Sequence, residues 1–241
     1  MSKVAIVTGG SKGIGEATVA RLLADGCLVY NLDITPSETG QHVHCDVSDV
    51  DAVANAVTTI GQKHGQIDIL VSNAGRHLSA NIENTTEQMF DELFALNVKG
   101  AYSLIKHALP FMKMHGGAIV LVASDQALIG KKNSFAYNLS KASLASIART
   151  TALDYAAHNI RANAVCPGTI ETPLYHNAID NYCEKSGADK ADIHAEEEAL
   201  QPLNRLGKAT EVADFIGFLV SDKASFITGS LQVIDGGYTA Q

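Results

Sequence analysis

Short apolar runs alternate along the chain with longer segments whose apolar residues recur at helical spacing. The runs are residues 3–8, 27–32, 42–45, 67–72, 118–123, 160–166 and 231–234, and turn-forming residues bound most of them. Continuous apolar runs of this length are typical of strands buried in a parallel sheet. The pattern therefore predicts one doubly wound α/β domain over residues 1–241, with a parallel seven-stranded sheet and helices on both faces.

Two segments depart from this regular alternation. Residues 86–115 have helical spacing that is interrupted near Asn97 and Gly100. An Asn within an apolar helix face is costly unless its amide is paired, so Asn97 marks either a kink or a polar group aimed into a site. Residues 172–205 mix charge and apolar positions without clear periodicity, and we expect this insert to be a substrate loop or lid.

Composition narrows the classes of partner. Hydrophobic residues make up 46% of 241 residues, and the formal net charge is −8, which argues against nucleic acid or an anionic membrane surface and favours a small-molecule partner. The four cysteines form no C-x-x-C pair, and neither a signal peptide nor a membrane span is evident. The expected location is the cytoplasm.

A glycine-rich turn follows the first predicted strand. Gly9, Ser11, Lys12 and the run Gly13-Ile14-Gly15 lead directly into a helical segment. Glycines allow close approach of the backbone to a pyrophosphate, and a helix N-terminus offers free N–H groups to it. Strand, glycine turn and helix together favour a dinucleotide phosphate site over an ordinary strand-to-helix turn.

Asp33 ends the second predicted strand. A carboxylate at that place can accept hydrogen bonds from the adenosine ribose and repels a 2′-phosphate, which favours NAD(H) over NADP(H). Lys12 argues in the opposite direction because its cation could attract such a phosphate. The alternative is that Asp33 is only a solvated loop residue.

A second constellation begins with Ser124, at the end of the fifth predicted strand, and includes Tyr137 and Lys141 at i and i+4 of a predicted helix. Ligands bind at the carboxyl ends of strands in open parallel sheets, so Ser124 is suitably placed. An ammonium one helical turn from a phenol is expected to lower the phenol's pKa and make Tyr137 a usable acid or base. Chance spacing is the alternative.

Together these residues resemble the short-chain dehydrogenase/reductase family over nearly the whole chain. The likeness is carried by TGGSKGIG at 8–15, Asp33, Asp46-Val47, NAG at 73–75, Asn97, Ser124, YNLSK at 137–141, PGTIETP at 167–173 and TGSLQVIDGG at 228–237. The resemblance implies a Rossmann-like fold and a homotetramer.

The family's residue roles follow from the same resemblance. It implies that Tyr137 is the general acid/base, that Lys141 lowers its pKa and holds the nicotinamide ribose, that Ser124 orients the substrate oxygen, and that Asn97 supports a proton path. It also implies a cofactor-binding set beyond the glycine turn and Asp33, namely Asp46, Val47, Asn73, Ala74, Gly75, Tyr137, Lys141, Pro167, Gly168, Ile170 and Thr172.

Two positions depart from the family pattern. Ser72 stands where an asparagine is common, and Asn138 stands where a small residue is usual. Candidate substrate residues are Gln126, Ser134, His77, His176 and Arg205.

The function that best fits these residues is hydride transfer between NAD(H) and a small alcohol or ketone, with a hydroxy acid, diol or sugar acid as substrate. Alternatives are an NADP(H)-dependent ketoreductase, a non-catalytic NAD-binding regulator, and an enzyme that uses bound NAD for epimerisation or dehydration. No metal site is expected.

Overall fold

A computed structural model describes residues 2–241 and contains a parallel seven-stranded sheet. Its strands are β1 (Val4–Thr8), β2 (Leu28–Asp33), β3 (Gln41–His44), β4 (Ile69–Ser72), β5 (Gly117–Val122), β6 (Ile160–Pro167) and β9 (Leu231–Ile234). The order in the sheet is β3-β2-β1-β4-β5-β6-β9, and every neighbouring pair is parallel. The predicted fold class and all seven strands are confirmed.

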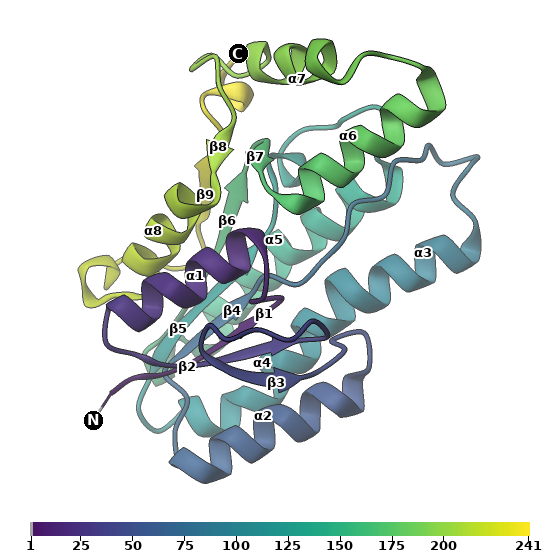
Figure 1. The fold of residues 1–241 in the computed structure, drawn as a ribbon. Coiled ribbons are helices and arrows are strands. Elements are labelled where there is room, and N and C mark those ends of the chain that lie inside the picture. The colour runs from purple at the N-terminus through teal and green to yellow at the C-terminus, as the bar shows by residue number, and fades with distance from the viewer. Residues whose placement is uncertain (1) are drawn as a thin grey trace.

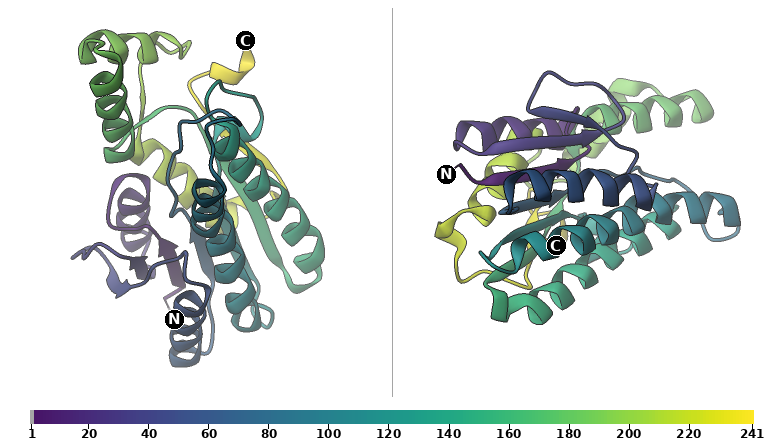
Figure 2. Two further views of the ribbon diagram at one scale, coloured as in Figure 1. Left: turned by 90° about the vertical axis from the view of Figure 1, so that its right-hand side faces the viewer. Right: turned by 90° about the horizontal axis from the view of Figure 1, so that it is seen from below.

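Helices cover both faces of the sheet (Figures 1 and 2). One layer holds α1 (Gly13–Ala24) and α8 (Ala209–Val220), whose residues Val19 and Ile216 pack in one buried cluster with strand residues such as Val7. The other layer holds α2 (Val50–His64), α4 (Gly100–Met112) and α5 (Phe135–Tyr155), packed in a second cluster. Both faces of the central strands are therefore buried, which explains their continuous apolar sequence.

The predicted interruption near Asn97 is a stretch of π-helix. α3 (Glu87–Phe94) runs into π-helical residues Ala95–Lys99, and α4 starts directly afterwards at Gly100. An added Cβ at Gly100 would lie 2.8 Å from the carbonyl oxygen of Val47, so this close packing of helix against loop requires glycine. π-helical turns often occur at functional sites because they reorient a side chain within a helix.

The segment 172–205 is more regular than its sequence suggests. It forms α6 (Pro173–Ser186) and α7 (Lys190–Ala199), which extend beyond the sheet at the top of Figure 1. Tyr175 and Ile179 of α6 pack with Leu206 in a small separate apolar cluster. A two-stranded sheet of β7 (Ile170–Glu171) and β8 (Gly207–Lys208) closes the base of this insert. The sequence did not indicate these two short strands.

Short 3-10 turns complete the chain at Asp125–Ala127, Ala156–His158, Asp222–Ala224 and Tyr238–Ala240. No helix of the described residues is both long and apolar enough to cross a membrane. Within residues 2–241, no cluster of His, Cys, Asp and Glu side chains has the composition of a metal site. All four cysteines are free.

Candidate active site

A cleft of about 360 Å³ runs along the carboxyl ends of β1, β2 and β4. The predicted cofactor residues that line it are Gly9, Lys12, Gly13, Ile14, Asp33, Asp46, Val47, Asn73, Ala74, Gly75 and Thr172. They come from the ends of different strands because the parallel sheet brings all carboxyl ends to one edge. The structure therefore brings these predicted residues, which are far apart in the sequence, together in one cleft.

The glycine turn is shaped for close backbone approach. Gly9 has a φ of +64°, and an added Cβ would lie 2.8 Å from the Cα of Ala74. An added Cβ at Gly15 would lie 2.0 Å from the carbonyl oxygen of Gly9. Neither position can accept a side chain without moving backbone.

The first turn of α1 has free hydrogen-bond donors. Lys12 is the residue before the helix, and its side chain caps none of the helix's N–H groups. Uncapped N–H groups at a helix N-terminus bind anions such as phosphate. The glycine turn and this helix end therefore fit the pyrophosphate of a dinucleotide.

Asp33 is held by backbone donors on both sides of its carboxylate. Its Oδ2 accepts a hydrogen bond of 3.0 Å from the N–H of Ser11, and its Oδ1 accepts one of 2.8 Å from the N–H of Thr35. The hydroxyl of Ser11 donates to the carbonyl oxygen of Thr35 at 2.7 Å. Ser11 thus holds the loop beside the Asp33 carboxylate in place. Unlike the other residues predicted in the glycine turn, Ser11 does not line the cleft.

Asn73 links the strand ends that form the floor of the cleft. Its side-chain amide donates to the carbonyl oxygens of Thr8 and Gly9 at 3.1 and 3.0 Å. Its backbone N–H donates to the hydroxyl of Thr8 at 3.0 Å. Asn73 therefore ties β4 to the glycine turn.

Some predicted cofactor residues lie behind or beside the cleft. Pro167 ends β6, and Gly168 packs so closely that an added Cβ would lie 2.9 Å from the Cα of Asp235. Ile170 is 8% exposed and lines a different, smaller pocket. Residues that sequence reasoning missed are Leu32, Ile34, Thr35, Cys45, Leu96, Pro173, Leu174 and Asn177. Several of them are sequence neighbours of predicted residues, and this proximity to the motifs could have identified them.

Ser124, Tyr137 and Lys141 lie together at the carboxyl end of β5. The Nζ of Lys141 is 5.6 Å from the centroid of the Tyr137 ring and donates a hydrogen bond of 2.9 Å to the carbonyl oxygen of Val122. The Ser124 hydroxyl lies beside the Tyr137 phenol and donates its hydrogen bond to Asp125 Oδ1 at 2.6 Å. The geometry therefore brings an acid/base, a cation and a hydroxyl to one point.

The pKa of Tyr137 is shifted in the direction opposite to the expected one. Burial raises the pKa of Tyr137 to about 12, and the negative charge of Asp125 adds to this effect. Burial also lowers the pKa of Lys141 to about 8. The expected lowering of the Tyr137 pKa by Lys141 is wrong for this structure, because loss of water around the phenol is the largest influence on that pKa and raises it.

Asn97 is both a product of the helix kink and a buried hydrogen-bonding group. Its Oδ1 accepts from the N–H of Arg76 at 3.0 Å, and its Nδ2 donates to the carbonyl oxygen of Arg76 and to the hydroxyl of Ser140, each at 3.1 Å. Asn97 thus joins the loop after β4 to the helix that carries Tyr137. The sequence left open whether Asn97 marks a kink or a polar group aimed into a site; the structure shows a π-helical stretch in which the Asn97 amide is paired with Arg76 and Ser140.

Among the candidate substrate residues, His77 contacts Tyr137. The His77 ring meets the Tyr137 ring edge-on with centroids 4.8 Å apart, and burial lowers the pKa of His77. Gln126 is 9% exposed, and its buried Oε1 has no partner among the described residues. Ser134 directly precedes α5 and forms a bridge to Ala80. A buried amide oxygen without a partner is a natural acceptor for a substrate hydroxyl.

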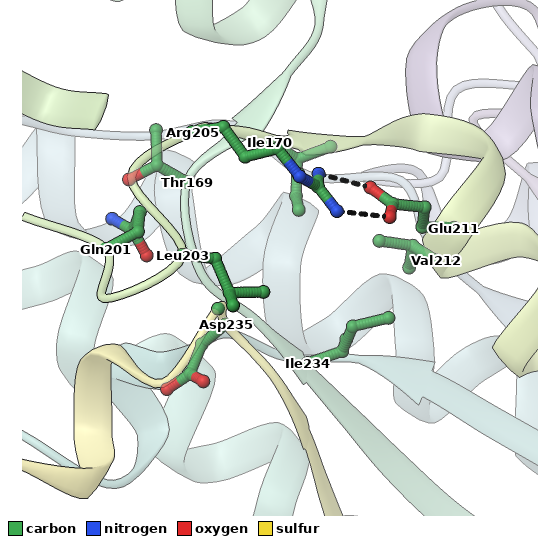
Figure 3. A pocket seen from close by; sticks show the side chains of 11 residues that line it. Thr169, Ile170, Gln201, Leu203, Arg205, Glu211, Val212, Ile234 and Asp235 are labelled. Carbon is green, nitrogen blue, oxygen red and sulfur yellow. Dashed lines mark hydrogen bonds and ion pairs between the residues drawn. The ribbon is translucent and has the colours of Figure 1, made fainter. Parts of the chain in front are cut away.

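The other two candidates lie farther along the insert. His176 of α6 has its Nε2 3.8 Å from a carboxylate oxygen of Glu171. Arg205 forms a bidentate ion pair with Glu211, at 2.9 and 2.7 Å. Figure 3 shows this pair at one end of a pocket of about 90 Å³, which Gln201 and Asp235 also line. Arg205 therefore faces this smaller pocket and not the cleft beside Asp33.

Asn138, a departure from the family pattern, has a partner within its own chain. Its Nδ2 donates to the carbonyl oxygen of Ile129 at 2.8 Å, while its buried Oδ1 has no partner among the described residues. Asn138 thus anchors the loop 128–134 to α5. Ser72, the other departure, is buried at the end of β4.

Comparison with known proteins identifies relatives over the whole length. The profile of the enoyl-(acyl carrier protein) reductase family matches residues 9–239. The 2-(R)-hydroxypropyl-CoM dehydrogenase of Xanthobacter autotrophicus is 36% identical, with 100% of each chain covered. The cis-4-hydroxycyclohexanecarboxylate dehydrogenase of Sinomonas cyclohexanicum is 38% identical, covering 99% of this chain and 97% of the relative.

Solved structures agree with this assignment. A short chain dehydrogenase family protein from Francisella tularensis has a TM-score of 0.95 at 39% identity, with 100% of both chains covered. The ligand-free aldohexose dehydrogenase of Thermoplasma acidophilum has a TM-score of 0.94 at 36% identity, covering 100% of this chain and 95% of that one. ElxO with NADP bound has a TM-score of 0.90 at 30% identity, with 100% of both chains covered.

Proposed function

Because the chain belongs to the short-chain dehydrogenase/reductase family, whose members act on alcohols or ketones with a nicotinamide cofactor, we propose that it transfers a hydride between NAD(H) and a small alcohol or ketone. The observation that carries the choice of NAD(H) is Asp33, whose carboxylate lies in the wall of the cleft between the N–H groups of Ser11 and Thr35.

Asp33 decides the cofactor by charge. When bound, the nicotinamide accepts or donates the hydride, and the protein supplies binding, orientation and proton transfer. A carboxylate fixed in the cleft wall can accept hydrogen bonds from ribose hydroxyls but repels the 2′-phosphate of NADP(H). Lys12 also lines the cleft and could attract that phosphate. We give Asp33 the greater weight because backbone donors hold its carboxylate in place.

The chain's own residues provide the proton chemistry. In reduction, the phenol of Tyr137 donates its proton to the oxygen of the ketone, and in oxidation the phenolate accepts the proton of the alcohol. Because the pKa of Tyr137 is raised to about 12, oxidation should become faster as the pH rises. Ser124 contributes a hydroxyl beside Tyr137, and Lys141 holds the nicotinamide ribose through its ammonium. Asn97 fixes the loop and the helix on either side of this cluster.

The substrate is a small polar alcohol or its ketone, with hydroxy acids, diols and sugar acids as the first candidates. His77 contacts Tyr137, and the buried Oε1 of Gln126, two residues after Ser124, has no partner among the described residues. Relatives named for a hydroxypropyl thioether of coenzyme M, a hydroxycyclohexanecarboxylate and an aldohexose support a polar substrate without choosing among these classes. Family likeness supports a homotetramer, and the four free thiols are consistent with a reducing compartment such as the cytoplasm.

The test is a panel of hydroxy acids, sugar acids, cyclic diols and steroids, followed by NADH fluorescence, with NADP⁺ run beside NAD⁺. We expect oxidation of at least one polar alcohol with NAD⁺ as the better cofactor. Faster turnover with NADP⁺ would refute the argument from Asp33. Tight NADH binding without turnover of any substrate would favour a non-catalytic regulator, and product formation without net NADH would favour epimerisation or dehydration.

A further inference from the structure

A buried carboxylate follows Ser124 directly, in the 3-10 turn Asp125–Ala127. Asp125 is 5% exposed, and its Oδ1 accepts hydrogen bonds from the Ser124 hydroxyl at 2.6 Å and from the N–H of Gln126 at 2.7 Å. The N–H of Gln126 also has Ser124 Oγ as an acceptor at 3.2 Å. The turn therefore has an acceptor for that N–H without the carboxylate, and burying a charge is costly unless it serves another purpose.

The bond to Asp125 changes what Ser124 can offer. A serine hydroxyl has one proton to donate and two lone pairs with which to accept. Because the proton is directed to the carboxylate of Asp125, Ser124 presents lone pairs to the remaining space beside Tyr137. An alcohol brings a proton that such lone pairs can accept, whereas a ketone brings only acceptors.

We propose that Asp125 is a positioning residue that holds the proton of Ser124 and thereby prepares the site beside Tyr137 to bind an alcohol in preference to a ketone. The inference rests on the proposed function and deepens it, because it states which form of the substrate, the alcohol or the ketone, this protein binds more tightly. A ketone can accept a hydrogen bond from Ser124 only after the Ser124 hydroxyl has broken its hydrogen bond to Asp125. Charge-assisted O–H···O⁻ bonds of this length are among the stronger hydrogen bonds in proteins, so that exchange is unfavourable.

Several charged or titratable groups surround Asp125. They are Lys131 on the loop before α5, Asp235 after β9, Tyr137 and Lys141 on α5, and Cys166 on β6. Burial raises the pKa of Asp125, while the hydrogen bonds from Ser124 and Gln126 and the charge of Lys131 oppose this rise. The charge of Asp125 in turn adds to the raised pKa of Tyr137. Neutralising Asp125 should therefore make Tyr137 easier to ionise.

The first experiment compares the wild type with Asp125→Ala, using as a matched pair the best alcohol substrate from the panel and the ketone formed from it. We expect the KM for the alcohol to rise and the KM for the ketone to fall, so that their ratio changes at least tenfold. The overall equilibrium constant is fixed, so compensating changes in kcat accompany this shift. Asp235→Asn is the control, because it removes a nearby buried carboxylate that does not bond to Ser124.

The second experiment needs no substrate. The absorbance of tyrosinate at 295 nm is titrated in the wild type and in Asp125→Asn, and the spectrum of each protein with Tyr137→Phe added is subtracted. We expect a larger ionised fraction of Tyr137 at pH 10.5 in Asp125→Asn, with circular dichroism confirming that the fold is intact. An unchanged KM ratio with an active wild type, or an unchanged titration, would overturn the proposal. If no alcohol is oxidised, the proposed function fails and the titration alone decides the role of Asp125.

Discussion

The ammonium of Lys141 donates a hydrogen bond of 2.9 Å to the carbonyl oxygen of Val122, the last residue of β5. Lys141 is 5% exposed, so its charge is removed from water and has a strand carbonyl as its partner. A buried ammonium with one neutral partner is a costly arrangement. The cost in stability fits the proposed role of Lys141 in holding the nicotinamide ribose better than a structural role.

Lys141→Met should make the protein more stable and less active. Burial lowers the pKa of Lys141 from its ordinary 10.5 to about 8, so at pH 7 the folded state carries a buried charge. We expect the variant's free energy of unfolding at pH 7 to rise by about 1 to 2 kcal/mol, which is less than the pKa shift alone implies because the Val122 carbonyl loses its donor.

The stability difference between Lys141→Met and the wild type should decrease as the pH rises. Between about pH 8 and 10.5 the folded wild type loses the Lys141 proton before the unfolded chain does, so wild-type stability rises with pH in that window. The advantage of Lys141→Met should therefore shrink from pH 7 to pH 9.5 in urea unfolding. The exposed Lys106→Met is the control and should show no such trend. A variant less stable than the wild type at pH 7 would contradict this account.

Tyr137→Phe should abolish turnover without removing cofactor binding. The phenol lies beside Ser124 and is the group to which we assign proton exchange with the reacting oxygen. We expect kcat to fall by about 10² to 10⁴, while the dissociation constant for NADH, measured by fluorescence, changes by less than about threefold. Tyr155→Phe, at the other end of the same helix, serves as the matched control. Near-normal activity of Tyr137→Phe would show that another group transfers the proton.

The sequence predicted the strands and the nearness of Ser124, Tyr137 and Lys141 well, because both depend on strong local patterns. Each central strand is a continuous apolar run buried on both faces, and parallel pairing then brings Asp33 and Ser124 to the same edge. The spacing of Tyr137 and Lys141 places them together on any helix. These relationships need no knowledge of distant contacts.

The features that sequence missed depend on contacts between distant segments. The pairing of Ile170 with Gly207 joins positions on either side of the insert, and neither flanking sequence has a strand pattern. Helices α6 and α7 bury little apolar surface beyond Tyr175 and Ile179, so their periodicity is weak. The direction of the Tyr137 pKa depends on burial, which a sequence pattern does not specify.

Asp33→Ser should change the choice of cofactor. Loss of the carboxylate removes the repulsion of a 2′-phosphate and the acceptor for ribose hydroxyls, so we expect kcat/KM to rise about tenfold with NADP⁺ and to fall about tenfold with NAD⁺. Steady-state kinetics with both cofactors measures the ratio. Asp46→Ser, on another part of the cleft wall, should affect both cofactors alike. A fall of equal size for NAD⁺ and NADP⁺ in Asp33→Ser would mean that Asp33 only holds the N–H groups of Ser11 and Thr35.

Asn97→Ala should destabilise the fold as well as slow the reaction. Asn97 is 2% exposed, and its side chain makes three hydrogen bonds that join Arg76 to Ser140. Removing them leaves the buried hydroxyl of Ser140 and two backbone groups of Arg76 without these partners, so we expect the free energy of unfolding to fall by about 1 to 3 kcal/mol. Urea unfolding measures this loss, with the exposed Asn84→Ala as the control. If Asn97→Ala keeps wild-type stability but loses activity, the residue acts in proton transfer and not by joining the loop to the helix. If both fall together, the catalytic loss follows from displacement of the helix that carries Tyr137.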